Sequence, residues 1–437
     1  MTNNLPILFV IGALIFSLSF MISSFPLEFS SWDEQEVKKV YFADAVGYAH
    51  AQLIDTFNER YAGQIEVVPI DLPFEKFNTN QRKELIARNL RSRSSRIDVF
   101  SVDLIWVPRF TRWAEPLSPY FPPQMLNQLV PNALETCYVD GHLVAIPLYL
   151  DVGVMYYRQD IIRDLPGGEQ IERRIRDSIS WEELIELRDK YFRDQPFYLF
   201  QGAPYEGLIC NYNEVLGVEL QDPLTGGIVD VSDPRMVERL AFMRYLIHPT
   251  GISPPEVLSL TEDACIRYAL QEDIPFVRGW PTINNEVEKR FDPVKFPLLR
   301  VAPLPHFEGE DYTPVFGGWN LMLSQHSPVK EEAITFMTFA ASRLGQQHFI
   351  EAATLLPVLQ ELYVEDSTDT RLQYLNTMMQ SGLHRPKHEK YTMISDVLAH
   401  QLHAVLAGDM GAQEGLDLAQ EQITEILENH AIHGEQP

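Results

Sequence analysis

Residues 97–106 read Ile97-Asp-Val-Phe-Ser-Val-Asp-Leu-Ile-Trp106, a nearly continuous apolar run that two aspartates interrupt. Such a run is typical of a β-strand buried on both faces, as in a parallel sheet. Apolar residues at helical spacing precede it between 85 and 90, and a helix-like stretch from 48 to 60 leads into the strand-like run 65–70. This β–α–β–α order predicts an α/β fold with a mostly parallel sheet flanked by helices.

A second extended run, Leu143–Arg158, is long for one strand and contains Pro147 and Gly153. An interrupted strand of this length is a natural place for the chain to cross between two lobes. Downstream, Ser180-Trp-Glu-Glu183 is a capping box that opens a helix through Tyr191. We find no Pro/Gly/Ser-rich linker that would separate independent domains, so we expect two intertwined lobes joined by crossover strands. The predicted first lobe comprises residues 38–147 and 306–355, and the second comprises 148–305 and 356–432.

The 437 residues are 45% hydrophobic and 22% charged, which is typical of a folded protein. The formal charge is 35 − 61 = −26. Such an acidic surface repels phosphate backbones, so we expect no nucleic-acid partner. Cys137, Cys210 and Cys265 are too few for a disulfide framework. They are either buried small side chains or one disulfide and a free thiol.

The N-terminal residues differ from the rest of the chain. From Leu5 to Phe25 the sequence is apolar apart from a few small or polar residues, and no charge follows until Glu28. This length can span a bilayer, so residues 1–25 are either a cleaved signal peptide or a retained membrane anchor. We favour the anchor, because a good small-residue cleavage site is absent. Either alternative predicts that the body of the chain is exported, to the periplasm or the outer face of the plasma membrane.

Searches for catalytic motifs find no metal-binding H-E-x-x-H, no phosphate-binding loop and no nucleophile elbow. His400 and His403 have a spacing found in metal sites, but no third ligand is suggested, and we expect a solvated helix face. We therefore expect no catalytic residue, no metal and no cofactor.

Polar and aromatic residues do recur at the ends of predicted strands, where ligands bind in open α/β sheets. Carboxylates accept strong hydrogen bonds from sugar hydroxyls, arginine donates from a fixed fork, and aromatic faces pack against the C–H groups of a sugar ring. Taken singly, each such residue is more commonly structural. As a set they indicate a carbohydrate site, at Asp103 and Trp106, Tyr149 and Asp151, Tyr205 and Glu206, Arg278 and Trp280, and Gly317-Gly318-Trp319.

The same pieces, in the same order, resemble the extracellular solute-binding proteins of sugar ABC importers, of the maltose-binding type and its trehalose/maltose branch. The resemblance covers nearly the whole chain from about residue 38. It is carried by Asp98-Val-Phe-Ser-Val-Asp103-Leu-Ile-Trp106, Ala145-Ile-Pro-Leu-Tyr149-Leu-Asp151-Val-Gly-Val-Met-Tyr-Tyr-Arg158, Ser180-Trp181-Glu-Glu-Leu184, Gln201-Gly-Ala-Pro-Tyr205-Glu206-Gly-Leu-Ile-Cys210-Asn211, Arg278-Gly-Trp280-Pro281 and Gly317-Gly318-Trp319-Asn-Leu.

This resemblance implies a two-lobed periplasmic-binding-protein-like fold of type II and a site between the lobes. Asp103 and Asp151 would accept hydrogen bonds from the sugar, Tyr149 and Trp280 would stack on it, and Glu206 would orient a second sugar unit or brace the pocket. Arg385 matches a late Arg-Pro that reaches back to the pocket. The full set of expected ligand-binding residues is Asp44, Asp103, Tyr149, Asp151, Tyr205, Glu206, Trp280, Gly317, Gly318, Trp319 and Arg385.

Three departures from the branch stand out. Phe200 replaces a usual tryptophan, Gly279 replaces a usual asparagine, and the lipoprotein cysteine is missing. The first two leave the identity of the sugar open, and trehalose and maltose are our leading expectations.

We expect a monomer that closes around its sugar and is then recognised by the transmembrane subunits of an ABC importer. Two alternatives remain open: a membrane-anchored sugar-sensing module and a glycoside hydrolase, which would need two carboxyls flanking one bond.

Overall fold

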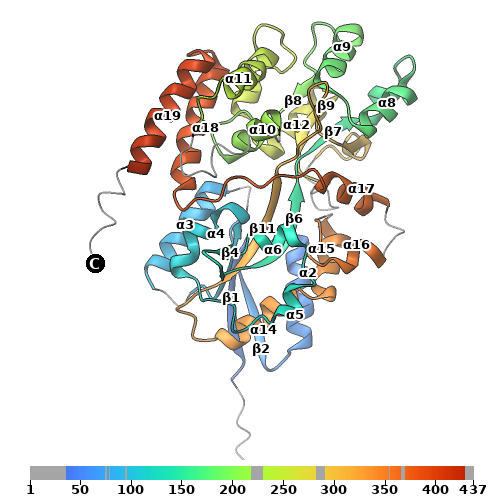
Figure 1. Cartoon of the computed structure of the whole chain (residues 1–437). Helices are drawn as coiled ribbons and strands as arrows, with labels where there is room; N and C mark the ends of the chain where they lie inside the picture. Colours follow the sequence, from blue (N-terminus) through green and yellow to red (C-terminus); the bar gives the residue numbers. More distant parts are fainter. Residues whose placement is uncertain are drawn as a thin grey trace, which may run out of the picture.

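The computed structural model describes residues 36–73, 76–77, 79–93, 96–217, 230–281, 291–353, 355–365 and 370–428. Two lobes lie one above the other, each built on a β-sheet with helices packed around it (Figure 1). The predicted two-lobed α/β fold is confirmed. The expected signal peptide or anchor at residues 1–25 lies outside the described residues.

The strands of the first lobe form a five-stranded sheet with the order β2-β1-β3-β11-β6. β1 pairs in parallel with both β2 and β3, whereas β11 runs antiparallel to its neighbours β3 and β6. Burial on both faces explains the apolar sequences of β3, β6 and β11. The bounds are β1 Lys38–Asp44, β2 Ile65–Asp71, β3 Val99–Asp103, β6 Ile146–Val152 and β11 Phe316–Leu323.

The second lobe contains a four-stranded sheet with the order β10-β7-β9-β8. β7 is antiparallel to β10 and β9, and β8 pairs in parallel with β9. A short hairpin of β4 and β5 belongs to neither large sheet. The bounds are β7 Val154–Arg158, β8 Tyr198–Leu199, β9 Phe276–Gly279, β10 Leu299–Ala302, β4 Tyr138–Val139 and β5 His142–Leu143.

Helices cover both sheets (Figure 1). Around the first lobe lie α2 Tyr48–Arg60, α3 Thr79–Arg91, α4 Val107–Phe110, α5 Pro123–Leu126, α6 Pro131–Glu135, α14 Lys330–Ala340 and α15 Arg343–Ala353. Around the second lobe lie α7 Gln159–Arg163, α8 Gly168–Asp177, α9 Trp181–Tyr191, α10 Glu206–Leu216, α11 Pro234–Ile247, α12 Glu262–Gln271, α18 Tyr391–Ala407 and α19 Ala412–Glu428. Two further helices, α16 Glu361–Glu365 and α17 Thr370–Met379, precede the segment that leads to α18.

The strand directions make the carboxyl ends of the two sheets face each other. In the first sheet β1, β3 and β6 run together and β11 is reversed, and in the second β8, β9 and β10 run together and β7 is reversed. β6 and β7 are separated by Gly153 alone, so β6 ends where β7 begins. β9 ends beside the start of β7, because Gly279 pairs with Val154. Side chains that follow these strands are therefore brought to the boundary between the lobes.

Two sequence expectations need correction in detail. The run 97–106 is not one strand: β3 ends at Asp103, and a 3₁₀ helix takes up Leu104–Trp106. The Asp103 carboxylate accepts a hydrogen bond from the N–H of Ile105 and so caps the turn. The run Leu143–Arg158 supplies β5, β6 and β7, and β6 continues in the first sheet to Val152, past the predicted lobe boundary at 147/148. The remaining lobe boundaries stay a prediction.

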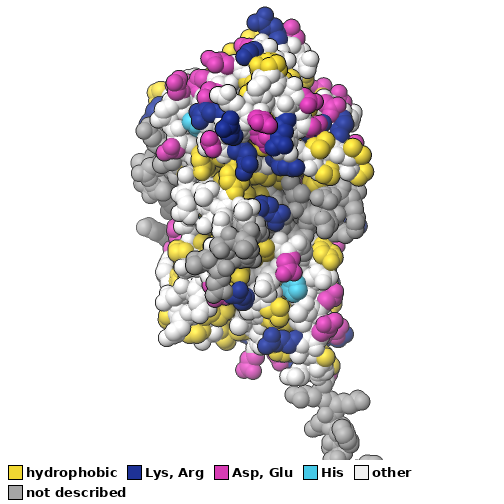
Figure 2. Space-filling model, turned by 90° about the vertical axis from the view of Figure 1, so that its right-hand side faces the viewer, with side chains coloured by type: hydrophobic (Ala, Val, Ile, Leu, Met, Phe, Trp, Pro, Cys, Tyr) yellow, Lys and Arg dark blue, Asp and Glu magenta, His cyan; other side chains and the backbone are white. Residues whose placement is uncertain are grey.

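Surface charges of both signs are intermixed. Figure 2 shows dark-blue Lys and Arg side chains gathered over the second lobe, with acidic side chains around them. The pair between Arg174 Nε and Glu183 Oε1, 2.7 Å apart, links α8 to α9 on this lobe. Exposed pairs of this kind contribute little to stability. None of the helices in the described part of the chain is long and apolar enough to cross a membrane.

Candidate functional site

Three predicted site residues form one row across the first sheet. Trp319 of β11 lies opposite Asp103 of β3 on one side and opposite Tyr149 of β6 on the other. Residues directly opposite in an antiparallel pair project from the same face of a sheet. An acceptor at the carboxyl end of β3 and two aromatic side chains, one from the middle of β6, therefore lie side by side.

Glycines let the second lobe approach this row closely. Gly317 lies opposite Asp151, and a Cβ at Gly317 would be 2.9 Å from Cζ3 of Trp280 and 3.2 Å from Cβ of Asp151. The indole that follows β9 therefore reaches the backbone of β11. Gly318 has φ +137°, and a Cβ there would lie 2.6 Å from the carbonyl oxygen of Tyr149. A side chain at this position would be strained and would displace β6.

Asp44, at the end of β1, is engaged by two basic side chains, Arg82 and His50. Its Oδ1 is 2.8 Å from Nη2 of Arg82, and its Oδ2 is 3.3 Å from Nε2 of His50. The Arg82 guanidinium carbon also lies 4.2 Å from the centre of the Trp319 ring. Burial alone raises the pKa of Asp44, but His50 and Arg82 hold it below its ordinary value. Asp44 is thus charged and paired at the edge of the row.

Arg385 connects the two lobes through two carboxylates. Its Nη2 lies 2.8 Å from Oδ1 of Asp103, and its Nη1 lies 2.8 Å from Oε1 of Glu206, the first residue of α10. Burial raises the pKa of Asp103 and the nearby Glu206 raises it further, while Arg385 opposes both. Tyr391 and Ser395 of α18 also donate to Glu206. The predicted residues Asp103, Glu206 and Arg385 are therefore brought together in one network.

Tyr205 has a different environment from its neighbour Glu206. Its ring folds back over Gly207, where a Cβ would lie 2.3 Å from the Tyr205 hydroxyl oxygen. The hydroxyl faces Glu262 of α12, and burial raises its pKa. Tyr205 thus packs within the second lobe, and the structure does not bring it into the Arg385 network.

Trp280 is supported from within its own lobe. The guanidinium carbon of Arg278 lies 4.1 Å from the centre of the Trp280 ring. Arg278 in turn donates from Nε and Nη2 to the two oxygens of Glu214, at 2.9 Å and 2.5 Å. This buried fork fixes the guanidinium plane and therefore the indole that rests on it.

Asp151 differs from the other site carboxylates. Its Oδ1 accepts a hydrogen bond from the N–H of Val152 at 3.0 Å, and Arg278 acts on it only from a distance. Burial raises the pKa of Asp151 to about 8, which the N–H and Arg278 offset only in part. Because burial disfavours the ionised form of Asp151, an added hydrogen-bond donor would stabilise its carboxylate.

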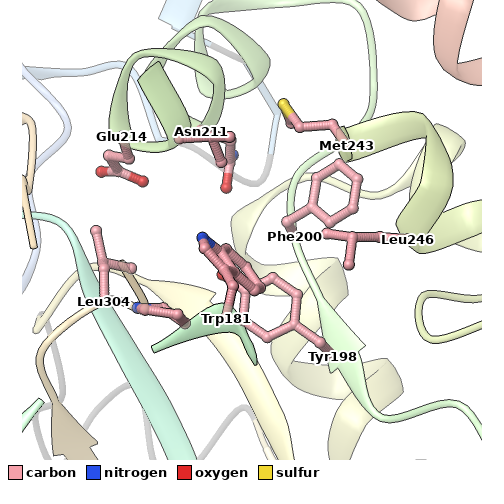
Figure 3. Close-up of a pocket in the computed structure, with 10 residues that line it drawn as sticks. Trp181, Tyr198, Phe200, Asn211, Glu214, Met243, Leu246 and Leu304 are labelled. Atoms are coloured by element: carbon pink, nitrogen blue, oxygen red, sulfur yellow. The ribbon is translucent and has the colours of Figure 1, made fainter. Parts of the chain in front are cut away.

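A separate small pocket lies inside the second lobe. Figure 3 shows it between the aromatic rings of Trp181, Tyr198 and Phe200 and the polar ends of Asn211 and Glu214. The centre of a water molecule fits within about 20 Å³ of this pocket. This is room for one or two waters and too little for a sugar ring. We therefore place the candidate ligand site at the boundary of the lobes. Among the described residues, no group of His, Cys, Asp and Glu could hold a metal ion.

Sequence reasoning missed several residues of this site. Arg82 was overlooked, although it shares a helical face with the buried Ile86 and Leu90 at intervals of four, which is unusual for an arginine. Tyr391 and Ser395, which hold Glu206, gave no signal because hydroxyl groups on an apolar helix are common. Their role follows from tertiary contacts alone.

The chain was compared with known protein families and sequences. The family model of bacterial extracellular solute-binding proteins matches residues 43–347. Among curated proteins, a probable ABC transporter-binding protein of Deinococcus radiodurans is 24% identical over 365 residues, which cover 80% of this chain and 84% of that protein.

Solved structures were compared as well. The maltose-bound MalE3 of T. maritima is 25% identical with a TM-score of 0.77, and the match covers 89% of this chain and all (100%) of that one. The GacH receptor of Streptomyces glaucescens, studied without ligand and with acarbose, is 19% identical with a TM-score of 0.71 over 90% of this chain and 98% of its own. The second likeness concerns the fold alone.

Proposed function

Because this chain belongs to the family of bacterial extracellular solute-binding proteins, we propose that it captures a sugar between its lobes and delivers it to an ABC importer. The sugar we propose is an oligosaccharide such as trehalose or maltose. Support comes from the maltose-bound relative MalE3 and from the Deinococcus protein named as ABC transporter-binding. The protein would be exported, with residues 1–25 serving as signal peptide or anchor, and would act as a monomer.

The observation that carries this proposal is the meeting of carboxylates and aromatic rings at the boundary of the two sheets. Trp319 lies between Asp103 and Tyr149 in one lobe, and Trp280 of the other lobe reaches Gly317 beside Asp151. Sugars carry hydroxyls around the ring edge and C–H groups on the ring faces. The carboxylates can accept hydrogen bonds from the hydroxyls, and the aromatic rings can pack against the C–H groups.

We assign roles accordingly. Asp103 and Asp151 accept hydrogen bonds from sugar hydroxyls, with Asp44 at the edge of the site. Tyr149, Trp280 and Trp319 provide stacking surfaces. Gly317 and Gly318 allow close approach of the ligand and of Trp280. Arg385 donates to the sugar and Glu206 braces Arg385, while the position of Tyr205 favours a packing role.

The mechanism we propose is hinge closure without chemistry. A ligand that contacts both lobes stabilises the closed form over the open one, and the importer recognises the closed form. The crossings at Gly153 and at the start of β11 would absorb the rotation. No bond is made or broken.

Titration calorimetry with a sugar panel tests the proposal. We would use the full-length protein in a detergent without a sugar headgroup, because a maltoside detergent could occupy the site. Trehalose, maltose, sucrose, longer glucans and monosaccharides would be compared, and each mixture would be analysed for released monosaccharide. Binding to one class without turnover supports a capture protein. Hydrolysis would contradict the proposal, as would silence across the panel from a folded sample.

Substitution of Trp280 tests the placement of the site. Trp280→Ala is expected to weaken sugar binding about tenfold or more, because a stacking surface is lost while the fold is retained. Trp113→Ala is the matched control, since Trp113 lies in a short 3₁₀ helix of the first lobe and contacts Arg112. Equal affinity of the two variants would place the site elsewhere.

A further inference from the structure

The segment that carries Arg385 runs between the two lobes. It leaves α17, passes across the boundary of the lobes and enters α18 of the second lobe (Figure 1). Leu383 donates its N–H to the carbonyl of Pro314 at 2.9 Å and accepts from the N–H of Phe316 at 2.7 Å. Lys387 contacts the side chain of Glu135 in α6 at 3.2 Å. The segment around Arg385 is therefore fastened to the first lobe near the crossing into β11.

The Arg385 guanidinium occupies the position where the two lobes meet. One nitrogen is bonded to Asp103 at the end of β3, and another is bonded to Glu206 at the start of α10. Both distances are 2.8 Å, and the Arg385 side chain is only 1% exposed. A planar guanidinium that contacts two carboxylates fixes their separation, because its nitrogens keep a constant geometry. One side chain of the protein thus joins the two lobes directly.

The two ends of this connection are unequal. Glu206 also accepts hydrogen bonds from the hydroxyl of Tyr391, at 2.6 Å, and from that of Ser395. Its oxygens are thus held from α18, within the second lobe. Asp103 accepts the N–H of Ile105 at 3.1 Å in addition to Arg385. Because the segment around Arg385 and Asp103 both belong to the first lobe, the bond to Glu206 is the one that breaks when the lobes separate.

A second contact between the lobes lies nearby. Asn80 of α3 donates from Nδ2 to Oδ1 of Asp396 in α18, at 3.2 Å. Both side chains are exposed, so this bond is weaker than the buried one. It shows that α3 and α18 lie side by side in the same arrangement that joins Arg385 to Asp103.

We propose that Arg385 is an internal clasp that closes the two lobes on each other in the absence of sugar. The guanidinium stays with Asp103 and its bond to Glu206 joins the lobes, so an incoming sugar that uses Arg385 as a donor competes with the protein's own carboxylate. Asp103 acts as the positioning residue for Arg385, and Tyr391 and Ser395 act as positioning residues for Glu206. This proposal rests on the proposed function only where sugar competes with the clasp, because closure by Arg385 requires no ligand.

Distances between spin labels measure this closure directly. Labels are attached at Arg88→Cys on α3 and His400→Cys on α18, two exposed positions on the neighbouring helices. The three native cysteines are buried, so the label reacts with the introduced ones. Pulsed electron resonance on the sugar-free full-length protein is expected to give a dominant short distance.

Arg385→Met removes the clasp at similar side-chain length. We expect the ratio of short to long distances to fall about tenfold or more, the change that corresponds to loss of one charge-assisted hydrogen bond. Lys387→Met is the control: it lies on the same segment and its contact with Glu135 stays within the first lobe, so the distances should not change. A folded Arg385→Met protein with the wild-type distances overturns the proposal, as does a wild-type protein that is fully open without sugar.

A second variant covers the case in which Arg385→Met does not fold. Glu206→Gln keeps the shape of the side chain and removes the charge at the end that breaks, so we expect a smaller shift in the same direction. An unchanged distance distribution in this variant would contradict the clasp. All of these measurements are made without sugar, and calorimetry reports on sugar binding separately, so a failed clasp and a failed sugar-binding proposal give different results.

Discussion

At the scale of single residues, the carboxyl of Asp151 has a direct consequence for binding. Its pKa is raised to about 8 by burial, so at pH 7 the group is mostly protonated. A sugar hydroxyl that donates to the carboxylate favours the charged form and lowers the pKa. Binding should therefore release part of a proton at pH 7, and affinity should rise between pH 6 and pH 8.

Calorimetry in two buffers with different ionisation enthalpies measures this proton release. The Asp151→Asn variant serves as the control, because the amide cannot titrate and the dependence on buffer should disappear. Proton uptake on binding, or an identical buffer dependence in the variant, would show that Asp151 does not contact the ligand.

The same pKa shift also affects stability. A group whose folded pKa is raised contributes stability below its unfolded value, and this contribution is lost as the pH rises through the folded pKa. For Asp151 the window runs from about pH 4 to about pH 8. Above pH 8, Asp151→Asn should therefore be more stable than the wild type, by about 1 kcal/mol or more. Urea unfolding at pH 5 and pH 9 tests this, and an Asp151→Asn protein that is less stable at both would contradict it.

Single residues also show the limits of sequence reasoning. The aspartates, tryptophans and glycines of the site could be predicted because strand ends and glycine pairs leave local signals. Arg82 left only its place on the apolar face of α3 as a signal, because its partner Asp44 lies 38 residues away and is reached only after α3 packs on the sheet. Tyr205 and Glu206 were both expected at the ligand site, but these neighbours in sequence face different partners. Tyr205 faces Glu262, whereas Glu206 bonds to Arg385. Ligand contact by any of these residues stays a prediction.

At the scale of elements, the start of α9 offers a clear test. Ser180 Oγ accepts from the N–H of Glu183, and the Glu183 carboxylate accepts from the N–H of Ser180, as the sequence predicted. Ser180→Ala removes one of these bonds and should lower the free energy of unfolding by about 1 kcal/mol. Ser180→Thr should retain most of it, because threonine also caps. Denaturant unfolding compares the two, and equal losses would show that the cap is not the cause.

Strands were predicted less accurately than this helix, for physical reasons. The apolar run 97–106 continues beyond β3, but the carboxylate of Asp103 bonds to the N–H of Ile105 and turns the chain into a 3₁₀ helix. The run Leu143–Arg158 keeps its apolar character across Gly153 because β6 and β7 are both fully buried, although they belong to different sheets. The apolar sequence therefore predicts that these strands are buried, but it does not predict to which sheet each strand belongs.

At the scale of the whole molecule, a clasp that closes the empty protein predicts how fast sugar can enter. Sugar would bind to the open minority, so the observed binding rate should level off as sugar concentration rises and opening becomes limiting. Stopped-flow tryptophan fluorescence measures this rate. Arg385→Met should raise the plateau, and Lys387→Met should leave it unchanged. A rate that rises linearly to the highest sugar concentration would show that the empty lobes are already open.

The buried cysteines have a consequence of their own. Cys137, Cys210 and Cys265 are all free and buried, and burial raises the pKa of Cys210 to about 12 and those of the other two further. Oxidants and thiol-exchange enzymes react with exposed thiolates, which these residues do not offer in the folded state. In the folded protein these three thiols therefore do not respond to the redox potential of the surroundings. They can be oxidised only before folding is complete.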